Sequence, residues 1–256
     1  MNNERIGRRA KVKLILGELL RAVLPALVFG ILSSVLMGPI SRTSNISSML
    51  TFIYGAQIDE LEQVGLLFSL FFFAPPLLQL ALLGDMIPRE AKEEVYVLSR
   101  SKGRLLWYFK KLAGAILLSL LMSLVMLLSL LVYAVSGGAR ADGMLLQAIA
   151  ELMATWGLCM CAFVVFSNVI GLFIKPLYLL FITMFAYALG LVLMLTKQPA
   201  ADLFPTVQGM LYAHSSAFGR LSEGYFTPVF SAGYLIVMTA ALTALGAAKI
   251  RKSDIL

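Results

Sequence analysis

The chain has 256 residues, of which 60% are apolar and 14% are charged, and its formal net charge is +7 at pH 7. Soluble domains are about 45–50% apolar, so this composition argues against a soluble protein. It predicts a membrane protein if the apolar residues form continuous blocks.

Six uncharged blocks follow one another along the chain, at Ala22–Ile40, Val64–Gly84, Leu112–Val135, Leu152–Ile174, Leu177–Thr196 and Pro228–Ala248. A helix rises about 1.5 Å per residue, so roughly twenty residues cross a hydrocarbon core about 30 Å thick. Because lipid offers no water to backbone polar groups, spanning segments of this kind are helical. We expect an all-α polytopic protein with a single transmembrane domain over residues 1–256 and six spans, at about 22–40, 64–84, 112–135, 152–174, 177–196 and 228–248.

The basic residues are distributed as membrane topology requires. With the N-terminus and the C-terminus both in the cytoplasm, seventeen of the 21 Lys and Arg residues fall in cytoplasmic segments and four fall outside. This is a strong positive-inside bias. It accounts for the net charge without a nucleic-acid partner, and it indicates the lipid bilayer instead.

The N-terminal segment "RRAKVKLILGELLRAVLP" mixes basic and apolar residues. Such a composition is typical of an amphipathic helix in the membrane interface, and Pro25 is expected to separate this interfacial helix from the first span. A signal peptide is the alternative, but the apolar run is longer than a typical signal core and no clean cleavage site follows it.

A long outer segment between the fifth and sixth spans, "KQPAADLFPTVQGMLYAHSSAFGRLSEGYFTP", is too apolar for a solvated loop. We expect short helices there that re-enter the outer leaflet, which is acceptable where protein buries the backbone. A partly folded loop is the alternative. His214, the single histidine, is expected to be a polar surface residue.

Catalytic signatures are missing from the sequence. There is no G-x-x-x-x-G-K-[ST] phosphate loop and no H-E-x-x-H pair, so we expect neither an enzyme nor a metal site. Cys159 and Cys161 lie in the middle of a span and are expected to be buried packing residues. Glu151 is an acidic residue next to the fourth span, but none of the six uncharged blocks contains an acidic residue, so if transport occurs we expect its energy to come from elsewhere than an ion gradient.

One internal segment, "REAKEEVYVLSRSKGRLLWYFKK" from Arg89 to Lys111, contrasts with the apolar chain by its density of charge. A solvated cytoplasmic loop would explain its basic residues, but not its three glutamates beside Val95–Leu98. We expect a short cytoplasmic helix that begins at Pro88, a favourable first-turn residue, and that serves as a docking element.

The sequence after the second span resembles the ABC-2 permease family, the membrane subunits of type V ABC exporters. The resemblance is carried by "RE", then "Y-x-L-S-R", a basic turn and "W-x-x-x-K-L" before the third span, together with the layout of the six spans. It implies that 89–100 is a coupling helix in contact with a cytoplasmic ATPase. The implied interface residues are Arg89, Glu90, Glu93, Glu94, Tyr96, Val97, Ser99 and Arg100, and Lys111 corresponds to the basic residue before span three.

The resemblance also implies that different subunits bind ATP and form the substrate pathway. Cytoplasmic ABC ATPase subunits would bind ATP and Mg, this chain would bind no cofactor, and a second permease copy or a related permease would face spans two and five. Phe71, Phe72, Phe73 and Tyr187 could then line an apolar pathway for a hydrophobic or amphipathic substrate such as a peptide, drug or lipid-like molecule. The expected location is the cytoplasmic membrane of a bacterium.

Two other functions remain open at this point. One is an immunity or sensor subunit that protects against a peptide without a transport cycle. The other is an ion-coupled secondary transporter.

Overall fold

The structure is a computed structural model that describes residues 2–37, 45–54, 66–93, 103–196, 198–214 and 226–252. All of the regular elements within these ranges are helices, and two isolated bridges, Asn45–Arg140 and His214–Phe226, join loop residues. The helices, in chain order, are α1 (Asn2–Met37), α2 (Ile46–Tyr54), α3 (Leu66–Leu83), α4 (Met86–Glu93), α6 (Arg104–Ser136), α7 (Leu145–Leu152), η2 (Met153–Gly157), α8 (Leu158–Ile170), α9 (Pro176–Leu195), η3 (Pro199–Leu203), α10 (Pro205–Gly209), η4 (Leu211–Ala213) and α11 (Pro228–Lys252).

Five stretches of the described chain are long and apolar enough to cross a membrane. They are Leu19–Leu36 in α1, Arg104–Ser136, Leu145–Ile170, Leu177–Leu195 and Pro228–Lys252. The prediction of an all-helical, multi-pass membrane protein is therefore confirmed. Helix α3 has 18 residues and lies inside the predicted span 64–84, and its role as a sixth span stays a prediction.

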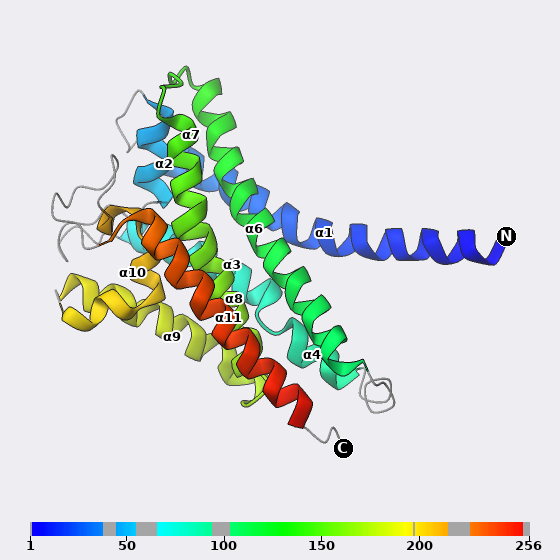
Figure 1. Ribbon diagram of the computed structural model, residues 1–256. Coiled ribbons are helices and arrows are strands. Elements are labelled where there is room, and N and C mark those ends of the chain that lie inside the picture. Colours follow the sequence, from blue (N-terminus) through cyan, green and yellow to red (C-terminus); the bar gives the residue numbers. More distant parts are fainter. Residues whose placement is uncertain are drawn as a thin grey trace.

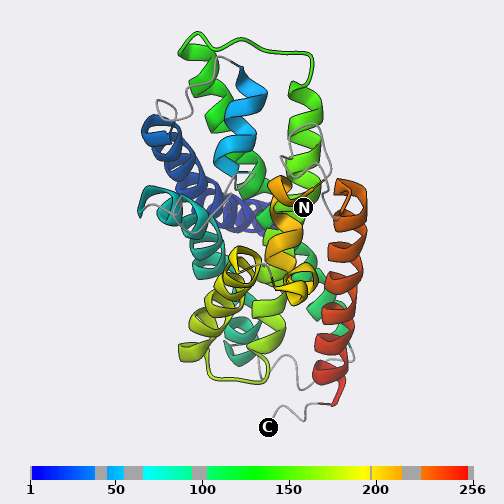
Figure 2. The ribbon, with the colours of Figure 1, turned by 90° about the vertical axis from the view of Figure 1, so that its left-hand side faces the viewer.

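Helix α8 is the centre of the bundle. It contacts α3, α6, α9 and α11, while α1 packs along α6 and also touches α3. Ten of its thirteen residues are buried, including Cys159 and Cys161, as expected from the sequence. Figure 2 shows α9 and α11 on opposite sides of the bundle, so the bundle presents one face at α3 and α9 and another at α6 and α11.

Two of the predicted boundaries change. Pro25 does not separate two helices, because α1 continues from Asn2 through Pro25 to Met37; a proline inside a membrane helix is tolerated where neighbouring groups satisfy the freed backbone. The third predicted span, 112–135, is part of a longer helix that begins at Arg104. At about 1.5 Å per residue, α6 extends beyond the hydrocarbon thickness.

Polar side chains join α3 to α6 inside the apolar bundle. The amide of Gln79 donates to the Ser123 hydroxyl at 3.0 Å and accepts from the Ser119 hydroxyl at 2.6 Å. All three side chains are buried. Each of these three side chains thus has a hydrogen-bond partner, which removes most of the desolvation cost of burying it.

The segment between α9 and α11 forms the short helices that its composition predicts, namely η3, α10 and η4. They are tied to the spans by buried hydrogen bonds. Thr206 donates to the Tyr187 carbonyl of α9 at 2.9 Å, and Ser231 of α11 donates to Gln208 at 2.5 Å. This segment therefore packs as part of the bundle, and its re-entry into the outer leaflet stays a prediction.

His214 is buried in this segment, contrary to the expectation of a surface residue. Its Nδ1 lies 2.7 Å from the Met210 carbonyl oxygen and its Nε2 lies 2.6 Å from the Ser231 hydroxyl. Burial lowers the pKa of His214, while the hydrogen bond to Met210 and the charge of Glu151 act in the opposite direction. The sequence gives no sign of this burial because the contacts come from three separate elements.

Candidate functional site: the elbow between α3 and α4

The candidate site is the elbow between α3 and α4, which we define as residues Leu83–Glu93. Figure 1 places α4 at the same end of the bundle as the C-terminus. A two-residue turn at Gly84 and Asp85 separates the helices, and α4 begins at Met86. The predicted start at Pro88 is therefore wrong by two residues. The helix can begin earlier because the Ile87 N–H, which has no partner in its own helix, donates to the side chain of Asn168.

Helix α4 has two different faces. Met86, Ile87 and Pro88 are buried, whereas the side chains of Arg89 and Lys92 are exposed. A helix with one apolar side and one charged side rests on a protein surface and presents its charges outward. The start of the predicted docking helix is thus an amphipathic element seated on the bundle.

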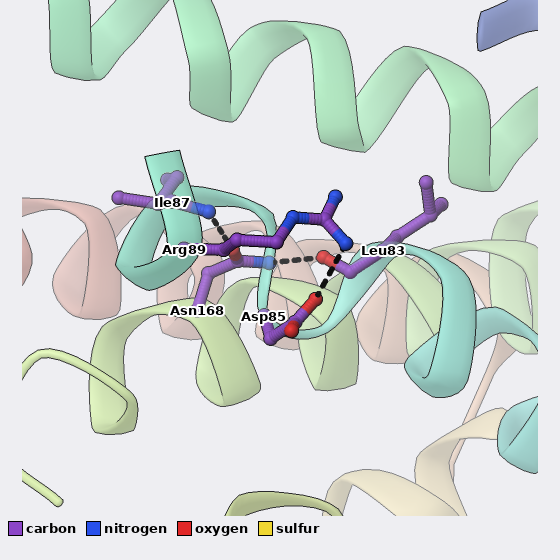
Figure 3. Close-up of polar contacts among 5 residues, drawn as sticks. All are labelled: Leu83, Asp85, Ile87, Arg89 and Asn168. Carbon is purple, nitrogen blue, oxygen red and sulfur yellow. Dashed lines mark hydrogen bonds and ion pairs between the residues drawn. The ribbon is translucent and has the colours of Figure 1, made fainter. Parts of the chain in front are cut away.

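Asn168 of α8 holds both sides of the elbow (Figure 3). Its amide nitrogen donates to the Leu83 carbonyl at 2.7 Å, and its amide oxygen accepts from the Ile87 N–H at 2.8 Å. The last carbonyls and first N–H groups of helices lack partners within their own helix. One fully buried side chain therefore caps the end of α3 and the beginning of α4 at once.

Asn168 also donates to the Val164 carbonyl of its own helix at 2.9 Å. The amide thus makes three hydrogen bonds, two through its nitrogen and one through its oxygen, which leaves little freedom for it to rotate. The elbow is consequently attached to the central helix at a fixed position.

Close packing at two glycines brings the elbow against α8. A Cβ on Gly84 would lie 2.8 Å from the Ser167 hydroxyl and 2.5 Å from the Leu80 carbonyl oxygen. A Cβ on Gly171 would lie 2.5 Å from Cγ of Pro88. Real Cβ atoms do not approach other atoms this closely, so larger residues at either position would push the elbow away from α8.

A second attachment joins α4 to α6. The Lys111 ammonium lies 2.5 Å from the Glu90 carboxylate, and the two side chains are 30% and 15% exposed. A partly buried ion pair is screened less by water and salt than an exposed one, so it is the stronger of the two. Glu90, predicted as an interface residue, is thus bound within the chain, and Lys111 is its partner.

Arg89 is also paired, but loosely. Its guanidinium lies 3.8 Å from the Asp85 carboxylate, and both side chains are well exposed (Figure 3). Such a pair contributes only about 0–1 kcal/mol. Arg89 can therefore exchange Asp85 for another partner at little cost, and its prediction as an interface residue stays open.

The remaining predicted interface residues cannot be placed in the same way. Glu93 is the last residue of α4, and nothing is described of its side chain. Glu94, Tyr96, Val97, Ser99 and Arg100 lie outside the described residues.

The predicted pathway residues form an aromatic cluster between α3, α8 and α9. The Tyr187 ring lies 5.0 Å from that of Phe72 and 5.1 Å from that of Phe163, and Phe73 makes an edge contact with Phe72 at 5.1 Å. Nothing is described of the Phe71 side chain. The sequence thus selected three residues that do come together.

A cavity adjoins this cluster, lined in part by Phe72, Tyr187 and Trp156, but its volume is only about 10 Å³. That is about the room needed for one water molecule. A substrate pathway at this place would therefore require α3 and α9 to move apart, and the assignment of these residues to a pathway stays a prediction.

Asn168 lies within the fourth predicted span, 152–174, but the sequence did not identify it as a site residue. The available signal was an amide in an uncharged, mostly apolar block of 23 residues, where an unpaired polar group is costly. Its partners could not be inferred, since they lie 81 and 85 residues away in the chain.

Within the described residues, no three His, Cys, Asp or Glu side chains come together in a group that could hold a metal ion. The site consists of hydrogen bonds, ion pairs and close helix packing. Chemically, such an arrangement can transmit displacement between helices and can bind a partner through its charges.

The family model named DUF2705, described as "Protein of unknown function (DUF2705)", matches residues 43–256. No curated protein and no solved structure gives a significant match to the chain. The matched region contains α2 to α11, and with them the elbow, Asn168 and Lys111. Because the match extends over most of its length, the chain belongs to the DUF2705 family.

Proposed function

We propose that this chain is the membrane-spanning permease subunit of an ATP-driven exporter of the ABC-2 type. In this proposal a separate cytoplasmic ATPase binds ATP and Mg, and a second permease copy or a related permease completes the pathway. The assembly lies in the cytoplasmic membrane of a bacterium and moves a hydrophobic or amphipathic substrate outward.

The observation that carries the proposal is the double attachment of the elbow. Helix α4 is joined to the central helix α8 through Asn168 and to α6 through the Glu90–Lys111 ion pair. A force applied to α4 by a partner would therefore reach two long helices without first deforming a flexible loop. This is the mechanical property that a coupling element needs, since conformational change passes through contiguous packed groups.

The exposed charges of α4 support the docking half of the proposal. Arg89 and Lys92 lie on its exposed face, while the buried face rests on the bundle. A partner that docks here would meet cationic groups first, and complementary acidic groups on the partner would steer association. Glu90 contributes in a different way, by holding α4 to α6.

The aromatic cluster supports a substrate pathway between α3 and α9 if these two helices move apart. Phe72 of α3 and Tyr187 of α9 are in ring contact, and both helices also contact α8. Helices α3 and α9 correspond to spans two and five, which are expected to face the second permease. In the proposed cycle, displacement of α4 tilts α3, to which it is joined by a two-residue turn, and opens the contact between α3 and α9. The small cavity at the cluster would be the place where such an opening begins.

The decisive experiment is purification of the tagged chain in mild detergent from the host that encodes it. A copurifying protein with a Walker-type phosphate loop is the expected result. The variant Arg89→Glu/Lys92→Glu should lose the ATPase, whereas Lys175→Glu, which reverses another exposed charge at the start of α9, should retain it.

Three outcomes would contradict the proposal. Retention of the ATPase by Arg89→Glu/Lys92→Glu would show that these charges of α4 do not form the docking surface. Uptake by purified chain in vesicles, driven by a proton or sodium gradient without ATP, would favour an ion-coupled transporter. Protection of cells against a peptide without any ATPase partner would favour an immunity subunit.

A further inference from the structure

An apolar groove lies on the face of the bundle away from α3 and α9. Helices α6 and α11 form its walls and α8 forms its floor, and its volume is about 480 Å³. It is lined by Phe109, Ile116, Leu158, Cys161, Ile236, Thr239, Ala240, Thr243 and Ala244. The wall from α11 consists mainly of small residues, which leaves the space open.

Two of the polar groups that line the groove already have partners within the protein. The Thr243 hydroxyl donates to the Thr239 carbonyl at 2.7 Å, and the Cys161 thiol lies 3.7 Å from the Ile116 carbonyl. The rest of the lining is mostly hydrocarbon, so a ligand meets few hydrogen-bonding groups. A linear alkyl chain fits this chemistry, whereas a polar solute does not.

The depth of the groove agrees with one leaflet of a bilayer. Phe109 and Ile116 are seven residues apart on α6, a rise of about 10 Å, which fits within a leaflet about 15 Å thick. At the basic end of both helices, Tyr108 packs against Gly246 and donates to the Thr243 carbonyl at 3.2 Å. This contact closes the groove toward the interior of the bundle at that end.

The basic end carries cations on both walls. Lys110 directly follows Phe109, and Arg251 lies seven residues beyond Ala244, a spacing that places both α11 residues on one side of the helix. Lys110, Arg251 and Lys252 are exposed, and neither α6 nor α11 contains an acidic residue. The positive-inside rule assigns this end to the cytoplasmic leaflet, where anionic lipids attract basic groups.

We propose that this groove binds one acyl chain of an anionic phospholipid of the cytoplasmic leaflet, with the lipid phosphate at Lys110 and Arg251. The apolar walls receive the chain, and the cations at the mouth select the headgroup. A lipid without net charge would place its acyl chain against the apolar walls but would not gain the attraction of its headgroup to the cations at the mouth. The site therefore prefers anionic over zwitterionic phospholipids.

A helix from a second copy of the chain is the main alternative occupant. The concentration of cations at the mouth argues against it, because two copies related by a two-fold axis would bring like charges together. An anionic lipid neutralises the same cations. The inference does not depend on the proposed function, since it concerns the chain alone in a bilayer.

The test is native mass spectrometry of the purified chain in detergent, titrated with phosphatidylglycerol and, separately, with phosphatidylcholine. The unmodified chain should bind one phosphatidylglycerol preferentially. Ala240→Trp, which fills the groove, should weaken that binding about tenfold or more. Val237→Trp is the matched control, because Val237 is exposed on α11 and is not part of the lining.

A second variant keeps the test valid if Ala240→Trp does not fold. Lys110→Gln/Arg251→Gln changes only exposed side chains and should lower phosphatidylglycerol affinity about tenfold without changing phosphatidylcholine binding. Equal affinity of Ala240→Trp and Val237→Trp, or an unchanged lipid preference in the charge variant, would overturn the proposal. Disulfide cross-linking of two copies through Thr239→Cys in membranes would assign the groove to a second copy instead.

Discussion

Lys111 of α6 and Glu90 of α4 form an ion pair of 2.5 Å at the place where the charged segment meets the bundle. Both side chains are more buried than those of the neighbouring pair Arg89–Asp85. The two pairs thus have different consequences. Glu90 and Lys111 fix α4 in position, whereas Arg89 is available for another contact.

A double-mutant cycle should measure this ion pair directly. Glu90→Gln and Lys111→Gln should each lower the free energy of unfolding. Their coupling should exceed about 1 kcal/mol, because the ion pair is partly buried and is therefore screened less than an exposed pair. The free energy is measured by denaturant titration in mixed micelles. The same cycle on Arg89→Gln and Asp85→Asn is the control, with an expected coupling below about 1 kcal/mol.

A coupling near zero for Glu90 and Lys111 would contradict their role as an attachment. A coupling of similar size for both cycles would show that exposure does not distinguish the two pairs.

Replacement of Asn168 should loosen the elbow. Asn168→Leu removes the partner of the Ile87 N–H and of the Leu83 carbonyl, and each buried polar group left without a partner costs about 1–3 kcal/mol. A lower midpoint of thermal unfolding and faster hydrogen exchange at Ile87 are the expected results. Thr183→Val is the control, because that buried hydroxyl bonds only to the Leu179 carbonyl of its own helix. Unchanged exchange at Ile87 in Asn168→Leu would be inconsistent with the cap.

The amide of Gln79 should contribute to the packing of α3 on α6. Gln79→Leu keeps the size of the side chain approximately but loses the bonds to Ser119 and Ser123. Hydrogen bonds between membrane helices are worth about 0.6 kcal/mol on average and about 1.7 at most, so the loss in stability should lie in that range. Ser129→Ala, whose hydroxyl bonds only to the Val125 carbonyl of the same helix, should change stability less. A gain in stability in Gln79→Leu would refute the contribution.

The burial of His214 predicts a dependence of stability on pH. Burial lowers its pKa in the folded state below the ordinary value, so the unfolded chain binds the proton more readily. The stability contributed by neutral His214 is therefore complete above pH about 6.5 and falls as the pH drops through the lower folded-state pKa. Thermal unfolding from pH 7.5 to 5 should show this loss.

His214→Gln should flatten that profile, since glutamine does not titrate in the range. Glu151, whose charge faces His214, should act in the opposite direction, so Glu151→Gln should make the loss on acidification steeper. Identical profiles for the unmodified chain and His214→Gln would assign the pH dependence to other groups.

The topology on which the docking proposal depends can be tested by labelling. A cysteine in place of Lys92, which is exposed on α4, should react with a membrane-impermeant maleimide only after cells are permeabilised. A cysteine in place of Ala141, exposed in the turn between α6 and α7, should react in intact cells. The native Cys159 and Cys161 are buried and should give little background. Labelling of position 92 in intact cells would place the elbow outside and exclude an ATPase contact there.

Much of the fold could be predicted from the sequence because hydrophobic length is a local property. The blocks from Ala22, Leu112, Leu152, Leu177 and Pro228 all correspond to helices suited to a membrane. Their ends were less accurate: α6 includes Trp107 and Lys111, since a helix continues into the interface wherever its backbone is satisfied. The charged segment was recognised as distinctive for the same local reason, its composition.

The sequence by itself determined that the chain is an all-helical membrane protein, approximately where its spans lie, and which segment carries the charge, because length and polarity suffice to decide these properties. Only the tertiary structure decided which residues meet. A span that is apolar all round has no periodic signal from which its rotation could be read, so the partners of Asn168, the pairing of Glu90 with Lys111 and the burial of His214 depend on how helices far apart in sequence pack together.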